Sequence, residues 1–376
     1  MTQAHEPNRI ASLDTIRGIA AMVVLLGHCA GSFAWPIGWA NLPLINILFD
    51  GRSAVTMFFV LSGFVLSRLH VGSQRDGTSL KPLHVPTFYT RRITRIWIPW
   101  FAVFCLSAVA QNYFFHPRVT TPPTTEWING FWHSSLSIPS VLKQCIFQLH
   151  DTTQQLLPQD WSLGVELKGS ALIPIFVFLA RKNTLLMLGS GIALLLCLPT
   201  GHYYLSFAIG VSLAAYYDRL DGGLRKVSFP WKVALLGLGV ILYQSRQTAS
   251  YFCEVSGTPD KIVWCISSVG CFLIILMSLS SRRIQKSLSG TAAVFLGKIS
   301  YSLFLLQFLV LICLLPLFIA ALNKWGISQP LVILPLAIGF SVFSTILLAA
   351  ASYRLIEVPA IGLGRKLTTL IDRRPR

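Results

Sequence analysis

The stretch LDTIRGIAAMVVLLGHCAG, residues 13–31, decides the fold because it is apolar and long enough to cross a bilayer. It nevertheless carries Asp14 and Arg17 near one end and His28 deep inside. In a helix, Arg17 and His28 share one face about 16 Å apart along the axis, and Asp14 can pair with Arg17. Ionisable groups inside a membrane helix are costly and mark a functional site. The alternative is a packing histidine capped by a snorkelling arginine.

The composition identifies a polytopic membrane protein. Hydrophobic residues make up 53% of the 376-residue chain and charged residues 12%, about half of the charged share of an average soluble domain. The mean hydropathy is +0.63. We therefore expect an all-α integral membrane protein, a bundle of about ten transmembrane helices. The expected spans are 13–34, 45–67, 95–115, 161–180, 184–199, 202–217, 231–246, 261–281, 299–322 and 330–353.

The positions of the basic residues predict the orientation of these spans. Of the 31 Lys and Arg residues, 23 fall in one set of alternate connecting segments and six in the other. The positive-inside rule then places both termini in the cytoplasm. It also explains the net charge of +17 without a nucleic-acid partner. The expected partner is the lipid bilayer.

The same pattern divides the chain into three parts. We expect a cytoplasmic N-terminal segment over 1–12, a transmembrane domain over 13–358 and a basic cytoplasmic tail over 359–376. No cleavage site of a signal peptide follows the polar N-terminal segment, so the first span is expected to be retained. The outer segment 116–160 is too long for a simple connector and is interpreted as an external lid or a re-entrant segment.

The eight cysteines show no metal-ligand spacing, and no metal site is expected. Most of them lie in apolar runs, where they act as small hydrophobic residues. Only Cys145 and Cys253 fall in segments placed outside the cytoplasm, which leaves a disulfide between them open.

Four further stretches carry polar groups that suit chemistry. Arg91, Arg92 and Arg95 lie at the cytoplasmic entry of the third span, where they either set topology and touch anionic lipid or bind phosphate groups. Glu166 in WSLGVELK is able to approach His28 as a general-base pair, or to form a structural pair that fixes helix packing. Ser62–Gly63 is interpreted first as a small-residue face for helix packing. Arg354 and Glu357, three residues apart, are interpreted as a local salt bridge.

Taken together, these stretches resemble the acyltransferase 3 family of bacterial membrane O-acyltransferases. The matching segments occur in the family's order over nearly the whole chain: LDTIRGIAAMVVLLGH, FFVLSGFVLS, RRITRIWIPW, WSLGVE, LGKISYSLFLLQ and YRLIEVPAIGLGRK. The resemblance implies a ten-helix core that transfers an acyl group, usually acetyl from acetyl-CoA, to a hydroxyl of a sugar. It implies that Arg17 and His28 are an essential pair, that Arg92 and Arg95 belong to a cytoplasmic arginine motif, and that Glu166 is a site residue.

Two departures from the family pattern affect this expectation. Gln307 stands where the family commonly has a histidine, which puts the role of a second imidazole in doubt. Lys168 and Gly169 stand where bulky or aromatic residues are frequent, which is expected to alter the acceptor pocket.

The expected function is therefore O-acetylation in the bacterial inner membrane. His28, oriented by Glu166 or by Asp14 and Arg17, would deprotonate a hydroxyl of a sugar in an envelope or exported glycan or a glycosylated small molecule. Acetyl-CoA would stay on the cytoplasmic side, its phosphates near Arg91, Arg92 and Arg95. The rival interpretations are a proton-coupled transporter or flippase and a scaffold subunit of a glycan assembly complex. The sequence leaves the acceptor, the acyl chain, the oligomeric state and a covalent acyl-enzyme open.

Overall fold

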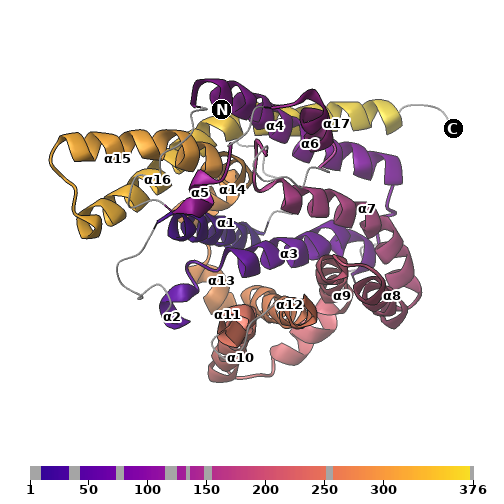
Figure 1. The fold of residues 1–376 in the computed structure, drawn as a ribbon. Helices are drawn as coiled ribbons and strands as arrows, with labels where there is room; N and C mark the ends of the chain where they lie inside the picture. The colour runs from indigo at the N-terminus through magenta and orange to yellow at the C-terminus, as the bar shows by residue number, and fades with distance from the viewer. Residues whose placement is uncertain are drawn as a thin grey trace.

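The computed structural model describes residues 10–33, 43–72, 80–114, 125–132, 136–147, 155–250 and 257–372. Every regular element in these ranges is a helix (Figure 1). Cys253, His133 and His150 lie outside the described residues, so the pairing of Cys145 with Cys253 stays open. The all-α membrane class expected from the composition is confirmed.

Each predicted span overlaps a long helix or a continuous run of helices. The long elements are α1 (Ala11–Ser32), α3 (Gly51–Val71), α4 (Val85–Phe114), α7 (Asp160–Lys182), α8 (Thr184–Cys197), α9 (Gly201–Leu224), α10 (Phe229–Tyr243), α12 (Gly257–Ser280), α14 (Thr291–Leu309) with η3 (Val310–Leu314) and α15 (Leu315–Lys324), and α16 (Pro330–Ser352) with η4 (Tyr353–Glu357) and α17 (Val358–Asp372). Five short helices connect them: α2 (Pro43–Asn46), α5 (Glu126–Asn129), α6 (Ile138–Cys145), α11 (Ser245–Ser250) and α13 (Arg282–Ser287). The predicted span 45–67 begins before α3, in α2 and the turn that follows it.

Seven helical runs in the described part of the chain are long and apolar enough to span a membrane. They begin at Ala11, Gly51, Val85, Asp160, Asp260, Thr291 and Pro330. Two more apolar helices, α8 and α10, have only 14 and 15 residues. At about 1.5 Å per residue, they are shorter than the ~30 Å hydrocarbon layer of a bilayer. The count of ten spans therefore stays an expectation.

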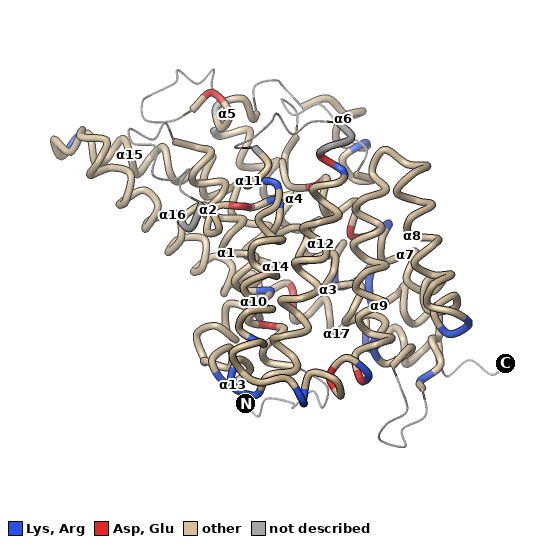
Figure 2. Tube along the Cα trace, turned by 90° about the horizontal axis from the view of Figure 1, so that it is seen from below, with Lys and Arg blue, Asp and Glu red and all other residues tan. Residues whose placement is uncertain are grey.

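Charge distinguishes the two ends of the bundle. Lys and Arg gather at the end where α13 lies, whereas α5, α6 and α11 lie at the opposite end (Figure 2). We call these the inner and the outer end, following the orientation that the basic residues predict. The residues 359–372, expected as a tail, continue α16 and η4 as a helix that packs along α4.

Glycines allow the helices around α1 and α3 to approach closely. A Cβ on Gly18 of α1 would lie 2.6 Å from the backbone nitrogen of Gly297 on α14. A Cβ on Gly63 of α3 would collide with the Phe207 carbonyl oxygen of α9, and one on Gly210 with the Val60 carbonyl oxygen. Such small residues let backbones pack where lipid provides no hydrophobic driving force. The packing role predicted for Ser62–Gly63 is thus confirmed for Gly63.

We expect Gly210→Ala to destabilise the protein, because its Cβ meets backbone atoms that cannot rotate away. Overpacking of this kind costs about 1–3 kcal/mol, which thermal unfolding in detergent detects as a lower Tm. Gly237→Ala on α10 is the matched control, since no atom lies within 4 Å of its Cβ position. Equal Tm values for the two variants would contradict the close crossing of α3 and α9.

Candidate active site

His28 lies near the outer end of α1. The helix ends at Ser32, four residues after His28, so the imidazole lies only about 6 Å from the helix end. The expected approach of Glu166 to this imidazole is not formed, because Glu166 pairs with Arg92 and Ser62. Asp14 and Arg17 lie in the first two turns of the same helix, towards the inner end.

Aromatic rings surround the imidazole of His28. The Phe308 ring lies 4.5 Å away between centroids, and the Trp127 ring stacks at 5.9 Å with an interplanar angle of 27°. Phe131 contacts both of these rings, at 5.3 Å from Trp127 and 5.5 Å from Phe308. Trp127 belongs to α5, so part of the outer segment 116–160 lies against the imidazole. This contact agrees with a covering role for that segment.

Gln307 determines which nitrogen of His28 carries the proton. Its Nε2 donates to the Phe304 carbonyl oxygen at 3.0 Å, and because a carbonyl only accepts, Oε1 must face the other way. Oε1 of Gln307 lies 3.1 Å from Nδ1 of His28. Because an amide oxygen is also only an acceptor, Nδ1 must be the donor of this hydrogen bond. The neutral imidazole therefore carries its proton on Nδ1 and has a lone pair on Nε2. No described residue hydrogen-bonds to Nε2, so this nitrogen is available as a base.

The hydrogen-bond chain continues to the start of α7. Gln159 Nε2 donates to the carbonyl oxygens of Phe304 and Leu305, at 3.3 and 2.8 Å. The next residue, Asp160, accepts a 2.7 Å hydrogen bond from Trp100 Nε1. Gln159 Oε1 and Asp160 Oδ2 are buried and have no hydrogen-bond partner among the described residues. Sequence reasoning missed Gln159 and Asp160; two polar residues directly before an apolar span were the available signal.

Glu166 belongs to a different cluster. Its Oε1 accepts from Ser62 Oγ at 2.8 Å and forms a tight ion pair with Arg92. Arg92 Nη2 also donates to Ser170 Oγ at 2.7 Å. The Arg92 and Glu166 side chains are only 14% and 15% exposed, so each neutralises a charge that would otherwise be costly. Glu166 therefore holds α3, α4 and α7 together, through Arg92 and Ser62 rather than through the expected pair with His28.

The three arginines of α4 point to different partners. The helix starts at Val85, ten residues before the predicted span, so all three arginines lie on one continuous helix. Arg91 is exposed and donates to Thr368 Oγ1 of α17 at 3.4 Å. Arg92 is turned inwards to Glu166. Arg95 is exposed and makes no hydrogen bond or ion pair with any described residue.

Arg17 and Arg95 belong to one electrostatic cluster. The charges of Arg95, Asp14, Glu166 and Arg92 all act on Arg17, and those of Arg95 and Arg17 act on Glu357. Glu357 is buried and accepts from Ser302 Oγ at 2.9 Å, so the predicted local salt bridge with Arg354 is not formed. No described residue accepts a hydrogen bond from Arg17. Two guanidinium groups thus remain available to an anionic ligand.

The two departures noted in the sequence have structural explanations. Gln307 replaces an imidazole with an acceptor that orients His28. Gly169 is required because the Phe207 ring of α9 occupies the space that a larger side chain would fill, whereas Lys168 is exposed. No group of three or more His, Cys, Asp or Glu side chains able to hold a metal occurs in the described part of the chain.

The arrangement separates two kinds of chemistry along α1. A neutral imidazole with a free Nε2 lies at the outer end, and available guanidinium groups lie about 16 Å towards the inner end. A base and an anion-binding cluster at opposite ends suit a reaction between two substrates that arrive from the two sides of a membrane.

Comparison with known proteins identifies the family. The sequence model of an acyltransferase domain matches residues 10–354. The chain is 28% identical over 198 residues to the O-acetyltransferase PaAT-1 of Phomopsis amygdali, covering 44% of this chain and 39% of that protein. It is 29% identical over 195 residues to the acyltransferase MdmB of Streptomyces mycarofaciens, covering 51% of this chain and 46% of that protein. The matches span less than half the length of these curated relatives.

No solved structure matches the chain significantly. The family model nevertheless extends from before α1 to the inner end of α16 and includes His28, Glu166 and Gln307. The chain therefore belongs to the acyltransferase 3 family.

Proposed function

We propose that this protein is a membrane O-acyltransferase that moves an acyl group, most simply acetyl, from cytoplasmic acetyl-CoA to a hydroxyl of a sugar. The acceptor would be an envelope or exported glycan or a glycosylated small molecule, and the membrane the bacterial inner membrane. The observation that carries the proposal is the His28–Gln307 hydrogen bond, because it leaves Nε2 as a proton acceptor at the outer end.

In this mechanism Nε2 of His28 takes the proton of the acceptor hydroxyl as its oxygen attacks the thioester carbonyl. The carbon–sulfur bond breaks, and the thiolate of coenzyme A leaves and receives that proton from the imidazolium. The imidazole then returns to its neutral state, and the proton count balances. Gln307 Oε1 accepts from Nδ1–H throughout and stabilises the imidazolium that forms in between. Asp14, Arg17 and Glu166 have no direct part in this proton transfer.

The donor would bind from the inner end. The phosphates of coenzyme A are too strongly charged to enter the bilayer without compensation. Arg95 and Arg17 offer that compensation because neither guanidinium hydrogen-bonds to a described residue, whereas Arg92 is already paired. The pantetheine arm would then extend along α1 towards His28. Arg91, on the exposed side of α4, contributes charge rather than direct contact.

We expect His28→Ala to lower kcat for acetyl transfer at least about 100-fold, the usual contribution of a general base. Transfer of label from acetyl-CoA to membrane glycans, with purified protein in lipid nanodiscs, measures the effect. His70→Ala is the control, since this half-buried histidine lies at the opposite end of the bundle and its side chain binds only the Lys81 carbonyl. Activity of His28→Ala within threefold of the wild type would eliminate the proposed base, and a wild type without transfer would favour a transporter.

Substitutions of two arginines of α4 should have different effects: that of Arg95 on the binding of acetyl-CoA, and that of Arg92 on the stability of the fold. Arg95→Gln is expected to raise KM for acetyl-CoA about tenfold or more, the loss of one charge-assisted hydrogen bond, without changing Tm. Arg92→Gln leaves Glu166 buried and unpaired, so it should cost about 3–5 kcal/mol of stability. The double variant Arg92→Gln/Glu166→Gln should recover part of that loss. Unchanged KM in Arg95→Gln, or an unchanged Tm in Arg92→Gln, would refute the corresponding assignment.

A further inference from the structure

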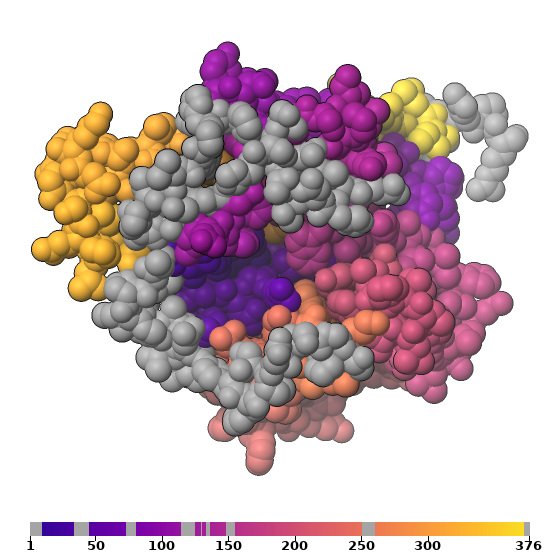
Figure 3. Space-filling model, viewed as in Figure 1, coloured from indigo at the N-terminus to yellow at the C-terminus, as the bar shows by residue number. Residues whose placement is uncertain are grey.

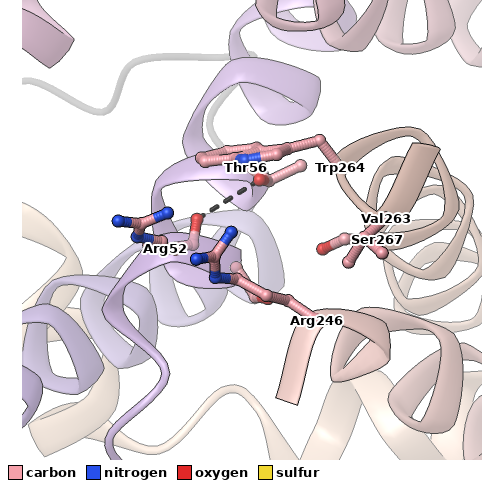
Figure 4. A pocket seen from close by; sticks show the side chains of 7 residues that line it. Arg52, Thr56, Arg246, Val263, Trp264 and Ser267 are labelled. Atoms are coloured by element: carbon pink, nitrogen blue, oxygen red, sulfur yellow. Dashed lines mark hydrogen bonds between the residues drawn. The ribbon is translucent and has the colours of Figure 1, made fainter. Parts of the chain in front are cut away.

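A small polar pocket lies at the outer end, between the first turns of α3, the start of α11 and the outer half of α12. Arg52, Arg246 and Trp264 are among the residues that line it (Figure 4). Its volume of about 10 Å³ is the space of about one water molecule. The charge of Arg246 is already paired with Asp260. This pocket therefore has room for an ordered water but not for a ligand.

A much larger apolar groove lies on the side of the bundle, between α4, the run of α14 and η3, and the run of α16 and η4. Its volume is about 410 Å³. Each of these three walls contributes four lining residues, and ten of the twelve are Ala, Val, Leu or Ile. Val103, Leu306 and Leu309 on its floor are buried, whereas Leu106 and Leu355 on its rim are exposed. The space is therefore a groove that is open on one side.

The surroundings of this groove are lipid. All three walls belong to helical runs that are long and apolar enough to span a membrane: Val85–Tyr113, Thr291–Lys324 and Pro330–Ile371. Figure 2 and Figure 3, which view the molecule at right angles, show the hairpin of α15 and α16 projecting from the side of the bundle. No water fills an apolar space inside a bilayer, and an empty groove would forfeit the dispersion contacts of its walls. A hydrocarbon chain is the occupant that the bilayer supplies.

Two π-helical turns line the groove. The described part of the chain contains two π-helical segments, η3 and η4, and each contributes two lining residues. These residues are Cys313 and Leu314 of η3, and Leu355 and Ile356 of η4. Such turns are rare and occur frequently at functional sites, because they interrupt the regular helix. An ordinary lipid-facing surface does not explain why both of them meet at one groove.

The groove lies behind the candidate active site rather than in it. Leu306 and Leu309 line the groove, whereas Gln307 and Phe308 contact His28. At about 100° per residue, these two pairs lie on opposite faces of α14. The helix α14 therefore separates a chain in the groove from the imidazole. Such a chain is not the acyl group that is transferred.

We propose that the groove binds one acyl chain of a bilayer phospholipid, which stays with the protein as a resident lipid between α4 and α16. The inference goes beyond the proposed acyl transfer and does not depend on it. A methylene group fills about as much space as a water molecule in the liquid, roughly 30 Å³, so the groove accommodates roughly a dozen methylene groups. Because lipid tails are as apolar as the walls, packing rather than hydrophobicity retains the chain. A polyprenyl chain is methyl-branched and much longer, and it does not match this volume.

Photo-crosslinking of the full chain, without acetyl-CoA, tests the proposal. The protein is loaded in nanodiscs with phosphatidylcholine that carries a diazirine in its palmitoyl chain, transferred to detergent, washed free of loose lipid and irradiated. Mass spectrometry of the digested protein then locates the label. We expect label on the groove walls at least about tenfold above that on α8, whose Leu185 and Leu196 are exposed and contact only exchanging lipid. Unlabelled dipalmitoyl phosphatidylcholine should displace the probe, whereas the dioctanoyl lipid and undecaprenyl phosphate should displace it poorly.

Variants that fill the groove provide the second arm. Ala102→Phe and Ala110→Phe each place a ring in the space of the chain, so retained label should fall at least about tenfold. Ala193→Phe, on the exposed side of α8, is the matched control and should keep wild-type labelling. Thermal unfolding shows which variants are folded, and the displacement series with the wild type needs no variant. The proposal is overturned if α8 retains as much label as the groove, if undecaprenyl phosphate displaces the probe best, or if folded Ala102→Phe and Ala110→Phe keep wild-type labelling.

Discussion

The hydrogen bond between His28 and Gln307 is the interaction on which the account of the site depends. Gln307 is fully buried and is fixed by the Phe304 carbonyl on its own helix, so its amide has one sensible orientation. The Phe304 carbonyl also accepts from Gln159, which ties α7 to the same turn of α14. Polar groups in a membrane protein must be satisfied internally. Here that requirement fixes the tautomer of a histidine whose ring stacks on Trp127 of α5.

The charged groups of the bundle interior form a separate system with a mainly structural purpose. Arg92, Glu166 and Ser62 connect α3, α4 and α7, and Glu357 is held by Ser302 of α14. These pairs leave Arg17 and Arg95 without hydrogen-bond partners in the described part of the chain. The interior therefore differs between the two ends of α1. The guanidinium groups of Arg17 and Arg95 lie towards one end, and the neutral imidazole of His28 lies at the other. That separation suits the transfer between two substrates that we propose.

The sequence predicted the helices well because span length and apolar content are local properties. The predicted span 95–115 begins ten residues after the start of α4, since VPTFYTRRIT at the start of this helix is amphipathic and falls outside an apolar window. The sequence also indicated the wrong partner for His28. Residue spacing shows which side chains share a helix face. It does not show the position of α7 along the bundle axis relative to α1 and α4, and this position brings Glu166 to Arg92. Gln307 was recognised as unusual, whereas its contact with His28 depends on how α1 packs on α14.

The most direct measurement is the protonation state of the His28 side chain. Nitrogen NMR of the full chain in nanodiscs with isotope-labelled histidine, with the His28 signal assigned by its loss in His28→Gln, reports which ring nitrogen carries the proton. We predict a neutral ring at pH 7 that is protonated on Nδ1, and loss of that preference in Gln307→Leu. A proton on Nε2, or a tautomer that does not respond to Gln307→Leu, would contradict the assignment of Nε2 as the base.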